Sequence, residues 1–322
     1  MKTTAKKILA LILVAATLVA CTFALSACGE QKKYTVGICQ LVRHDALDAA
    51  TKGFKDALTK ALGEENVNFI EQNAQNDTNA CTTIVTDFVS KNVDLIMANA
   101  TPALQAAANA TTTIPILGTS VTEYGVALGI NNFSGTVGGN ISGTSDLAPL
   151  TEQGDMILEL FPEAKNIGLI YCSAEANSEY QIKVIEEYLT GKGLKCTRYS
   201  FSDSNDISAV TTTAASQSDV IYIPTDNTAA SCTETIGNIV REKKVPVVAG
   251  EKGIASGCGV ATLSISYYDL GVKTGEMAAK ILKGEANISE MPIEYANATK
   301  MYNETFCKEL GITIPDGYTA IQ

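Results

Sequence analysis

From residue 34 onward the chain repeats one unit, a short apolar run rich in β-branched residues followed by a helical stretch. The first run is YTVGICQ at Tyr34–Gln40, and Asp45–Leu62 then carries apolar residues at helical spacing. Asp45 and Asp48 are placed like a helix N-cap and its partner at the third helical position. Strands that alternate with helices in this way favour right-handed crossovers between parallel strands. The repeat therefore predicts an α/β protein built on parallel sheets.

The strand candidates form two series, separated by a stretch rich in Gly, Asn and Ser at residues 129–146. Two series of this kind predict two doubly wound parallel-sheet lobes. The first series has its strands at Tyr34–Gln40, Val67–Gln72, Val93–Ala98 and Ile114–Gly118. The second has them at Ile167–Tyr171, Leu194–Tyr199, Val220–Ile223, Val245–Val248 and Val260–Leu263.

The N-terminus reads as an export signal. Lysines precede an apolar run at Ile8–Leu25, which ends in the tetrapeptide Leu25-Ser26-Ala27-Cys28. This tetrapeptide resembles a bacterial lipobox, in which the cysteine is lipidated and the chain is cut just before it. Residues 1–27 are then a lipoprotein signal peptide, Cys28 carries lipid that holds the protein at the outer face of the cell membrane, and residues 28–33 form a tether. The alternative is an uncleaved anchor, because about 18 apolar residues can just span a bilayer.

Composition excludes several classes of function. Removal of residues 1–27 leaves 295 residues, enough for two domains, and changes the formal net charge from −11 to −14. Such an acidic chain is no partner for nucleic acid. His44 is the only histidine and no CxxC motif occurs, which excludes a classical zinc site and a Ser-His-Asp triad. We expect no metal and no cofactor. Seven cysteines remain, an odd number that favours free thiols packed as small apolar residues: Cys39, Cys81, Cys172, Cys196, Cys232, Cys258 and Cys307.

Polar residues follow the predicted strands, at the sheet edge where parallel α/β proteins bind ligands. Each of them can be a helix cap, which is the simpler interpretation for any one residue. As a set they suggest more. Two polar doublets of the second series, at residues 177–178 and 226–227, would face Thr101 and Thr119 of the first. Hydroxyls at helix starts suit a carboxylate and Asp226 suits an ammonium group, so the edge predicts a site for a zwitterion.

Long blocks of the chain resemble one family. They include VGICQLVRHDALDAATKGFKDAL at residues 36–58, IMANATPALQAAANAT at 96–111, YCSAEANSEYQI at 171–182, IYIPTDNTAAS at 221–231 and PVVAGEKGIASGCGVATLSISYYDLG from Pro246. These blocks resemble the substrate-binding proteins of ABC transporters with a type I periplasmic-binding fold. Within that family they are most similar to tryptophan- and tyrosine-binding lipoproteins of Gram-positive bacteria.

The resemblance implies two lobes joined by three crossings that act as hinges. We expect these crossings near Asp146, near Ser264–Ser266 and near Gly284–Ile288. The first lobe would comprise residues 34–146 and 266–285, regaining a helix at Tyr268–Lys283, and the second lobe residues 147–265 and 286–322.

The resemblance also implies a set of residues in the cleft between the lobes. Thr101 and Thr119 would bind the ligand carboxylate and Asp226 its amine, Asn177 and Ser178 would contact it from the second lobe, and His44 would order the cleft mouth. The full set of implied ligand-binding residues is Gln40, Thr101, Thr119, Ser120, Ser145, Asp146, Asn177, Ser178, Asp226, Asn227 and Glu251. The aromatic residues that sequence places near the cleft are Tyr124, Phe133 and Tyr171.

The predicted function is capture of a small polar solute by an extracytoplasmic monomer that makes and breaks no bond. The solute is an amino acid, with an aromatic one among the candidates, and it passes to a membrane permease driven by a cytoplasmic ATPase. A ligand sensor for a membrane receptor would have the same fold. An extracytoplasmic enzyme is the third alternative, with Asp146 and Asp226 as its acid and base.

Overall fold

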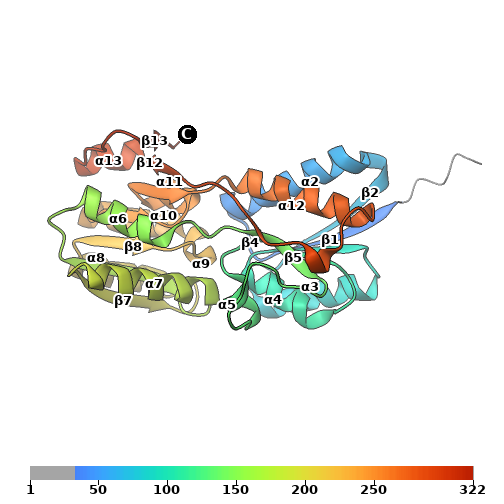
Figure 1. Cartoon of the computed structure of the whole chain (residues 1–322). Helices are drawn as coiled ribbons and strands as arrows, with labels where there is room; N and C mark the ends of the chain where they lie inside the picture. Colours follow the sequence, from blue (N-terminus) through green and yellow to red (C-terminus); the bar gives the residue numbers. More distant parts are fainter. Residues whose placement is uncertain (1–32, 322) are drawn as a thin grey trace, which may run out of the picture.

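The computed structural model describes residues 33–321, which form two α/β lobes lying side by side (Figure 1). The predicted signal peptide, the lipidation site Cys28 and all of the tether except Lys33 lie outside the described residues. Within the described residues, no helix is both long enough and apolar enough to cross a membrane. The two-lobed architecture confirms the predicted fold class.

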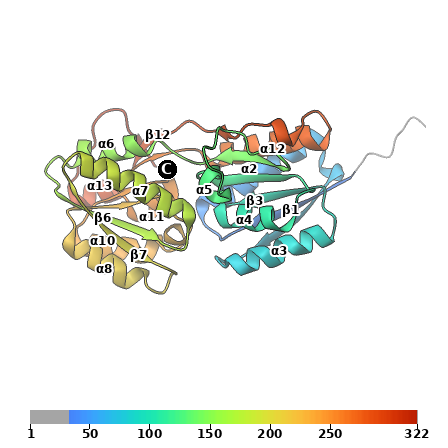
Figure 2. The same ribbon diagram turned by 60° about the horizontal axis from the view of Figure 1, so that its bottom comes forward.

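The first lobe is built on a six-stranded, wholly parallel sheet with the order β11-β5-β4-β3-β1-β2. Helices α3, α4 and α5 cover one face, and α2 and α12 cover the other (Figures 1 and 2). Its strands are β1 Tyr34–Gln40, β2 Val67–Asn73, β3 Leu95–Asn99, β4 Ile116–Val121, β5 Ile141–Ser145 and β11 Glu294–Tyr295. Its α-helices are α2 Asp45–Leu62, α3 Thr78–Ser90, α4 Thr101–Ala110, α5 Tyr124–Leu128 and α12 Tyr267–Leu282; the short 3₁₀ helices are η1 Glu64–Asn66 and η2 Ile288–Glu290.

The second lobe is built on a seven-stranded sheet with the order β13-β12-β10-β9-β8-β6-β7, in which only the pair β10–β12 is antiparallel. Its strands are β6 Asn166–Cys172, β7 Lys195–Phe201, β8 Val220–Ile223, β9 Val247–Ala249, β10 Ala261–Ser264, β12 Thr299–Tyr302 and β13 Thr319–Ala320. Its helices are α6 Leu150–Leu160, α7 Ala176–Gly191, α8 Ile207–Gln217, α9 Asn227–Ala230, α10 Thr233–Lys243, α11 Lys252–Cys258 and α13 Glu304–Leu310.

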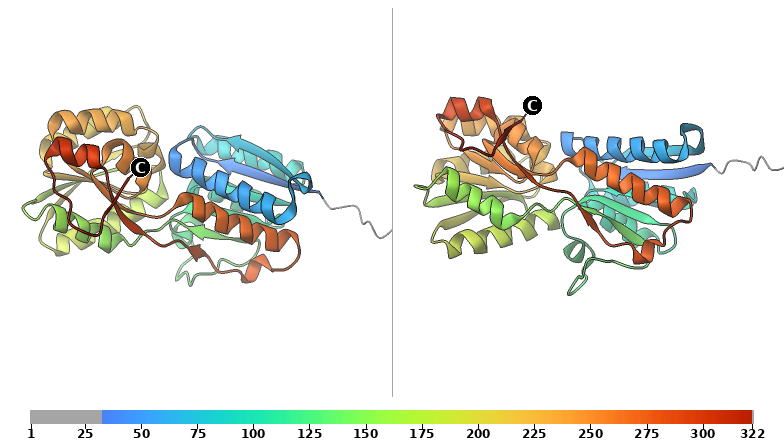
Figure 3. Two further views of the ribbon diagram at one scale, coloured as in Figure 1. Left: turned by 90° about the horizontal axis from the view of Figure 1, so that it is seen from above. Right: turned by 45° about the horizontal axis from the view of Figure 1, so that its top comes forward.

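Helix α12 returns to the first lobe and lies along α2, as the sequence predicts (Figure 3). The two helices approach closely because glycines stand where they meet. A Cβ atom built on Gly53 would lie 2.1 Å from the carbonyl oxygen of Tyr268, and one built on Gly271 would lie 2.0 Å from that of Ala50. Any larger residue would push α12 away from the lobe that it completes.

Local details depart from the sequence predictions at several places. His44 is the N-cap of α2, without a side-chain capping bond, so Asp45 is the first helical residue and its predicted capping role is wrong. Strand β5 lies inside the Gly-, Asn- and Ser-rich segment 129–146, for which the sequence predicts no strand, and it pairs with β4. The sequence also predicts none of the helices α5, α6 and α13 and none of the short strands β11, β12 and β13.

The chain crosses between the lobes three times (Figure 3). The first crossing joins β5 to α6 and the second joins β10 to α12, close to Asp146 and at 265–266 as expected. The predicted third crossing is wrong. After α12 the chain stays on the first lobe through β11, where Glu294 pairs with Thr144 and the side chain of Ile293 is buried in the first-lobe core. It reaches the second lobe only between β11 and β12, at residues 296–298.

Candidate ligand-binding cleft

Three polar residues of the predicted site meet at the edge of the first lobe. Thr101 begins α4 directly after β3, Ser120 lies near the end of β4, and Asp146 follows β5. The strands are neighbours in the sheet, and the backbone N–H of Asp146 donates to the carbonyl of Val121. The backbone is strained here: Ala100 has φ 94° and Ser120 has φ 53°, values that non-glycine residues rarely adopt. Strain of this kind concentrates where side chains are aimed for function.

Four buried side chains at or just after the ends of β3, β4, β5 and β6 each keep one polar atom without a hydrogen-bond partner. These atoms are the hydroxyls of Thr101 and Ser120, Oδ1 of Asp146 and Oδ1 of Asn177. None of the four residues is more than 4% exposed. A buried polar atom without a partner costs about 1–3 kcal/mol. Two hydroxyl donors and two oxygen acceptors are the complement of a zwitterion.

Asp146 is the carboxylate best placed to take a ligand. Its Oδ2 accepts a hydrogen bond of 3.0 Å from the Tyr267 hydroxyl, which leaves Oδ1 free. Burial raises the pKa of this carboxyl to about 6. The dry surroundings that raise its pKa strengthen any charge-assisted bond made there.

The two acidic residues predicted on the second lobe are occupied as helix caps. Asp226 caps α9, with Oδ1 accepting from the Ala229 N–H and Oδ2 accepting from the Cys172 N–H. Glu251 caps α11 in the same way, accepting from the N–H groups of Gly253 and Ile254. Burial raises the pKa of both carboxyls to about 7, and for Asp226 the nearby Glu175 adds to the effect. In both groups each carboxylate oxygen thus accepts a hydrogen bond from a backbone N–H.

Sequence reasoning missed Glu175. It is only 4% exposed, and its two oxygens accept five hydrogen bonds. The donors are the N–H and side-chain amide of Asn227, the N–H and hydroxyl of Thr228, and the amide of Asn177. It stands two residues before Asn177 in the block YCSAEANSEYQI, so its nearness to the polar doublet 177–178 is the one signal in the sequence that could identify it.

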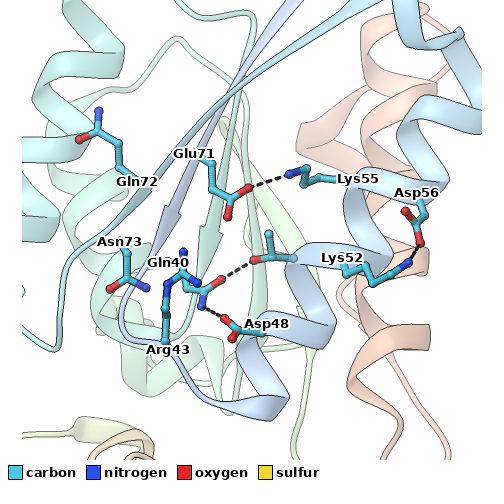
Figure 4. A pocket seen from close by; sticks show the side chains of 10 residues that line it. Gln40, Arg43, Asp48, Lys52, Lys55, Asp56, Glu71, Gln72 and Asn73 are labelled. Atoms are coloured by element: carbon cyan, nitrogen blue, oxygen red, sulfur yellow. Dashed lines mark hydrogen bonds and ion pairs between the residues drawn. The ribbon is translucent and has the colours of Figure 1, made fainter.

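Three predicted site residues, Gln40, Thr119 and Ser145, have hydrogen-bond partners within the first lobe or at its crossing. Gln40 is held against α2, donating to Asp48 and accepting from the Thr51 hydroxyl, beside a charged surface groove of about 480 Å³ (Figure 4). Thr119 belongs to a buried cluster of hydroxyls with Thr144 and with Thr274 of α12. Ser145 donates to the carbonyl of Thr122 at the first crossing. All three have structural partners inside the first lobe or its hinge.

The remaining predicted residues lie on the second-lobe side. Ser178 is fully buried beside Asn177, whose amide donates to its hydroxyl over 3.3 Å. Asn227 reaches the first lobe, where its Oδ1 lies 3.4 Å from Nε2 of His44. Burial lowers the pKa of His44. The lobes are therefore in contact across the cleft.

A groove of about 430 Å³ lies between the lobes beside the second and third crossings. Residues of α2, of α11 and of the crossing segments line it, among them Tyr267, Glu251 and Ile265. Its volume is in the range of small-molecule sites. Within residues 33–321, no group of three or more His, Cys, Asp or Glu side chains is arranged to hold a metal ion.

Comparisons with known proteins identify the family. The model of the ABC transporter substrate binding protein family matches residues 35–320, so the chain belongs to this family. A tyrosine-binding protein of Clostridioides difficile is 36% identical over 284 residues, which cover 87% of this chain and 82% of that protein. Members of the family bind solutes and are not enzymes.

Two solved structures show how the lobes are arranged. A domain from Streptococcus pneumonia in complex with L-Trp is 30% identical and superposes with a TM-score of 0.85, over 89% of this chain and 100% of that one. The ligand-free, open form of a substrate-binding protein with adhesive properties from Clostridium difficile is 38% identical but scores only 0.68, over 90% and 99%. The less similar sequence gives the better superposition, so the arrangement of this chain resembles that of the L-Trp complex more than that of the open form.

Proposed function

We propose that this protein captures an amino acid outside the cytoplasm and delivers it to an ABC importer. One observation carries the proposal: two hydroxyls and two side-chain oxygens, all buried and all without partners, lie at strand ends of the two sheets or in the first turn of the helix that follows.

The donor and acceptor atoms assign the ends of the ligand. The hydroxyls of Thr101 and Ser120 bind the α-carboxylate, at the start of α4 where the helix dipole also favours negative charge. Asp146 and Asn177 bind the α-ammonium through their Oδ1 atoms. Asp146 therefore takes the role that sequence reasoning gave to Asp226, because both oxygens of Asp226 already accept from backbone N–H groups.

We propose that the side chain of the ligand is aromatic. The support is similarity to a tyrosine-binding protein and to a domain crystallised with L-Trp, both at 30% identity or more over most of the chain. The basic leader, the apolar run and the Leu25–Cys28 motif support a lipid anchor on Cys28, which keeps the protein near its permease.

The chain contains no tryptophan, so the fluorescence of bound L-Trp reports binding directly. We expect purified protein lacking residues 1–27 to bind L-Tyr or L-Trp with micromolar or tighter affinity in titration calorimetry, and to bind glucose and myo-inositol much more weakly. Tight binding of a sugar with no binding of either amino acid would reject the proposal.

For the anchor, Cys28→Ser should abolish lipid labelling and release the protein into the medium or leave it unprocessed.

A further inference from the structure

Two hydrogen bonds join the lobes. Their first-lobe residues are Asn76 and His44, and no contact with the ligand is proposed for either of them. On one side, Nδ2 of Asn76 donates to Oγ1 of Thr228 over 2.9 Å. On the other, Nε2 of His44 lies 3.4 Å from Oδ1 of Asn227. Asn76 and His44 belong to loops of the first lobe, and Asn227 and Thr228 begin α9, at the side of the second lobe that faces the first (Figure 1).

The direction of both bonds is set by Glu175. The side-chain amide of Asn227 donates to Oε2 of Glu175, which turns Oδ1 of Asn227 toward His44. The hydroxyl of Thr228 donates its one hydrogen to Oε1 of Glu175, which leaves only lone pairs to face Asn76. The second lobe thus offers two acceptor oxygens, and the first lobe must supply two donors.

One of these donors, the side-chain amide of Asn76, is held in a fixed turn of the first lobe. Asn76 follows Gln75 in a turn where both residues have positive φ, of 65° and 53°. The backbone N–H of Asn76 donates to the carbonyl of Leu41, and the N–H of Gln75 donates to Oδ1 of Asn73. These bonds fix the turn, so the Asn76 amide is presented to the second lobe without a large loss of side-chain entropy on closure.

We propose that His44 and Asn76 on the first lobe, with Asn227 and Thr228 on the second, form a latch that holds the closed state, and that Glu175 is its positioning residue. The latch slows escape of the solute, although Asn76, Thr228 and Glu175 do not contact the solute. This inference rests on the proposed function only for the identity of the solute, because the contact between the lobes is independent of it.

The test begins with Asn76→Gly, since glycine adopts the same positive φ without strain and lacks the donor. The matched control is Asn92→Gly, because Asn92 is an exposed asparagine of the same lobe with a similar φ of 51°. We expect the dissociation rate of L-Trp, followed by its fluorescence in stopped flow, to rise about three- to tenfold in Asn76→Gly and to stay unchanged in the control. The association rate should change little. Equal dissociation rates in the two variants would overturn the latch.

A double-mutant cycle isolates the bond. Thr228→Val removes the acceptor, and combining it with Asn76→Gly should cost little more than Thr228→Val alone, because both changes delete one interaction. Fully additive effects would show that the two side chains act separately and would reject the latch.

Glu175→Gln tests the positioning role. It should raise the dissociation rate more than Asn76→Gly does, because both acceptor oxygens lose their orientation, and its effect should shrink in the Asn76→Gly background. Equal effects in both backgrounds would remove Glu175 from the latch. If this variant fails to fold, the first-lobe variant still decides the matter.

A final cross-linking experiment requires no solute. In a variant with Asn76→Cys and Thr228→Cys, a short bifunctional thiol reagent should link the two positions, as mapped by peptide mass spectrometry, whereas Asn92→Cys with Thr228→Cys should not be linked. Absence of the link would overturn the latch even if L-Trp binds well. Failure of the unaltered protein to bind L-Trp or L-Tyr, with the link present, would instead reject the proposed ligand.

Discussion

The two faces of the cleft differ in how their polar groups are used. On the first lobe, polar atoms of Thr101, Ser120, Asp146 and His44 have no hydrogen-bond partner. The acidic residues of the second-lobe face, Asp226, Glu251 and Glu175, all accept hydrogen bonds from backbone N–H groups. From this difference we propose that the first lobe holds most of the groups that recognise the solute and that the second lobe closes over it.

The largest effect should follow from Asp146→Asn. The change leaves an oxygen for the Tyr267 hydroxyl but removes the charge that pairs with the ligand ammonium. A charge-assisted buried hydrogen bond is worth about 1.5–3 kcal/mol, so affinity for the amino acid should fall about ten- to a hundredfold while folding is retained. Calorimetry checks this, with circular dichroism as the folding control. Affinity within a factor of two of the unaltered protein would show that the first lobe does not hold the ammonium.

Asp226→Ala should have the opposite profile. It strands the buried N–H groups of Cys172 and Ala229, and each orphaned donor costs about 1–3 kcal/mol, so the free energy of unfolding should fall by at least that amount. Affinity should stay within about threefold, measured at a temperature where the variant is folded. A tenfold loss of affinity with an unchanged melting temperature would return the ammonium to Asp226 and erase the contrast between the lobes.

Sequence reasoning reached the fold because the fold depends on patterns that repeat. The bounds of β1, α2 and β8 match the prediction, since each is a run of apolar residues at one clear period. The third crossing was misplaced because β11 has only two residues, and its attachment to β5 depends on tertiary packing of Ile293. A pattern that short carries no signal.

The sequence predicts which strand ends carry polar residues better than it predicts which of their atoms lack hydrogen-bond partners. The sequence offers Thr119 and Ser120 as equally good candidates for the site. In the structure the hydroxyl of Thr119 joins a buried hydroxyl cluster, whereas Ser120, with its positive φ, keeps a hydroxyl without a partner. Asp226 and Glu251 were correctly seen as possible caps, and their bonds to backbone N–H groups form only once the chain folds locally. The role of Glu175 depends on residues 52 and 53 positions away.

The pH dependence of stability should separate the faces further. Burial raises the pKa of Asp146 from 3.8 to about 6, so its contribution to stability is present below pH 4 and is lost as the pH rises through 6. Asp226 and Glu251, with pKa values near 7, act in the same direction. These three carboxyls therefore make the ligand-free protein less stable at pH 7 than at pH 5, whereas His44, whose pKa is lowered by burial, acts in the opposite direction. The stability of the Asp146→Asn variant should decline less as the pH rises. The difference in unfolding free energy between the variant and the unaltered protein should change by about 1.4 kcal/mol per pH unit between pH 4 and 6. Parallel curves for the two proteins would contradict this.

The smallest effect concerns single hydroxyls, and it tests whether a partnerless atom means recognition. Ser120→Ala should weaken amino-acid binding about two- to tenfold, because a neutral hydrogen bond contributes about 0.5–1.5 kcal/mol. Thr211 is the control: its hydroxyl is also buried and without a partner, but it lies on α8, away from the first lobe. Thr211→Val should raise the melting temperature slightly, since it removes an uncompensated buried group, and should leave affinity unchanged. Both variants relieve the same cost in the ligand-free protein, so only a hydroxyl that meets the solute can lower affinity when it is removed. If the two variants bind the amino acid equally well, the Ser120 hydroxyl does not contact the solute, and recognition on the first lobe rests on Thr101 and Asp146.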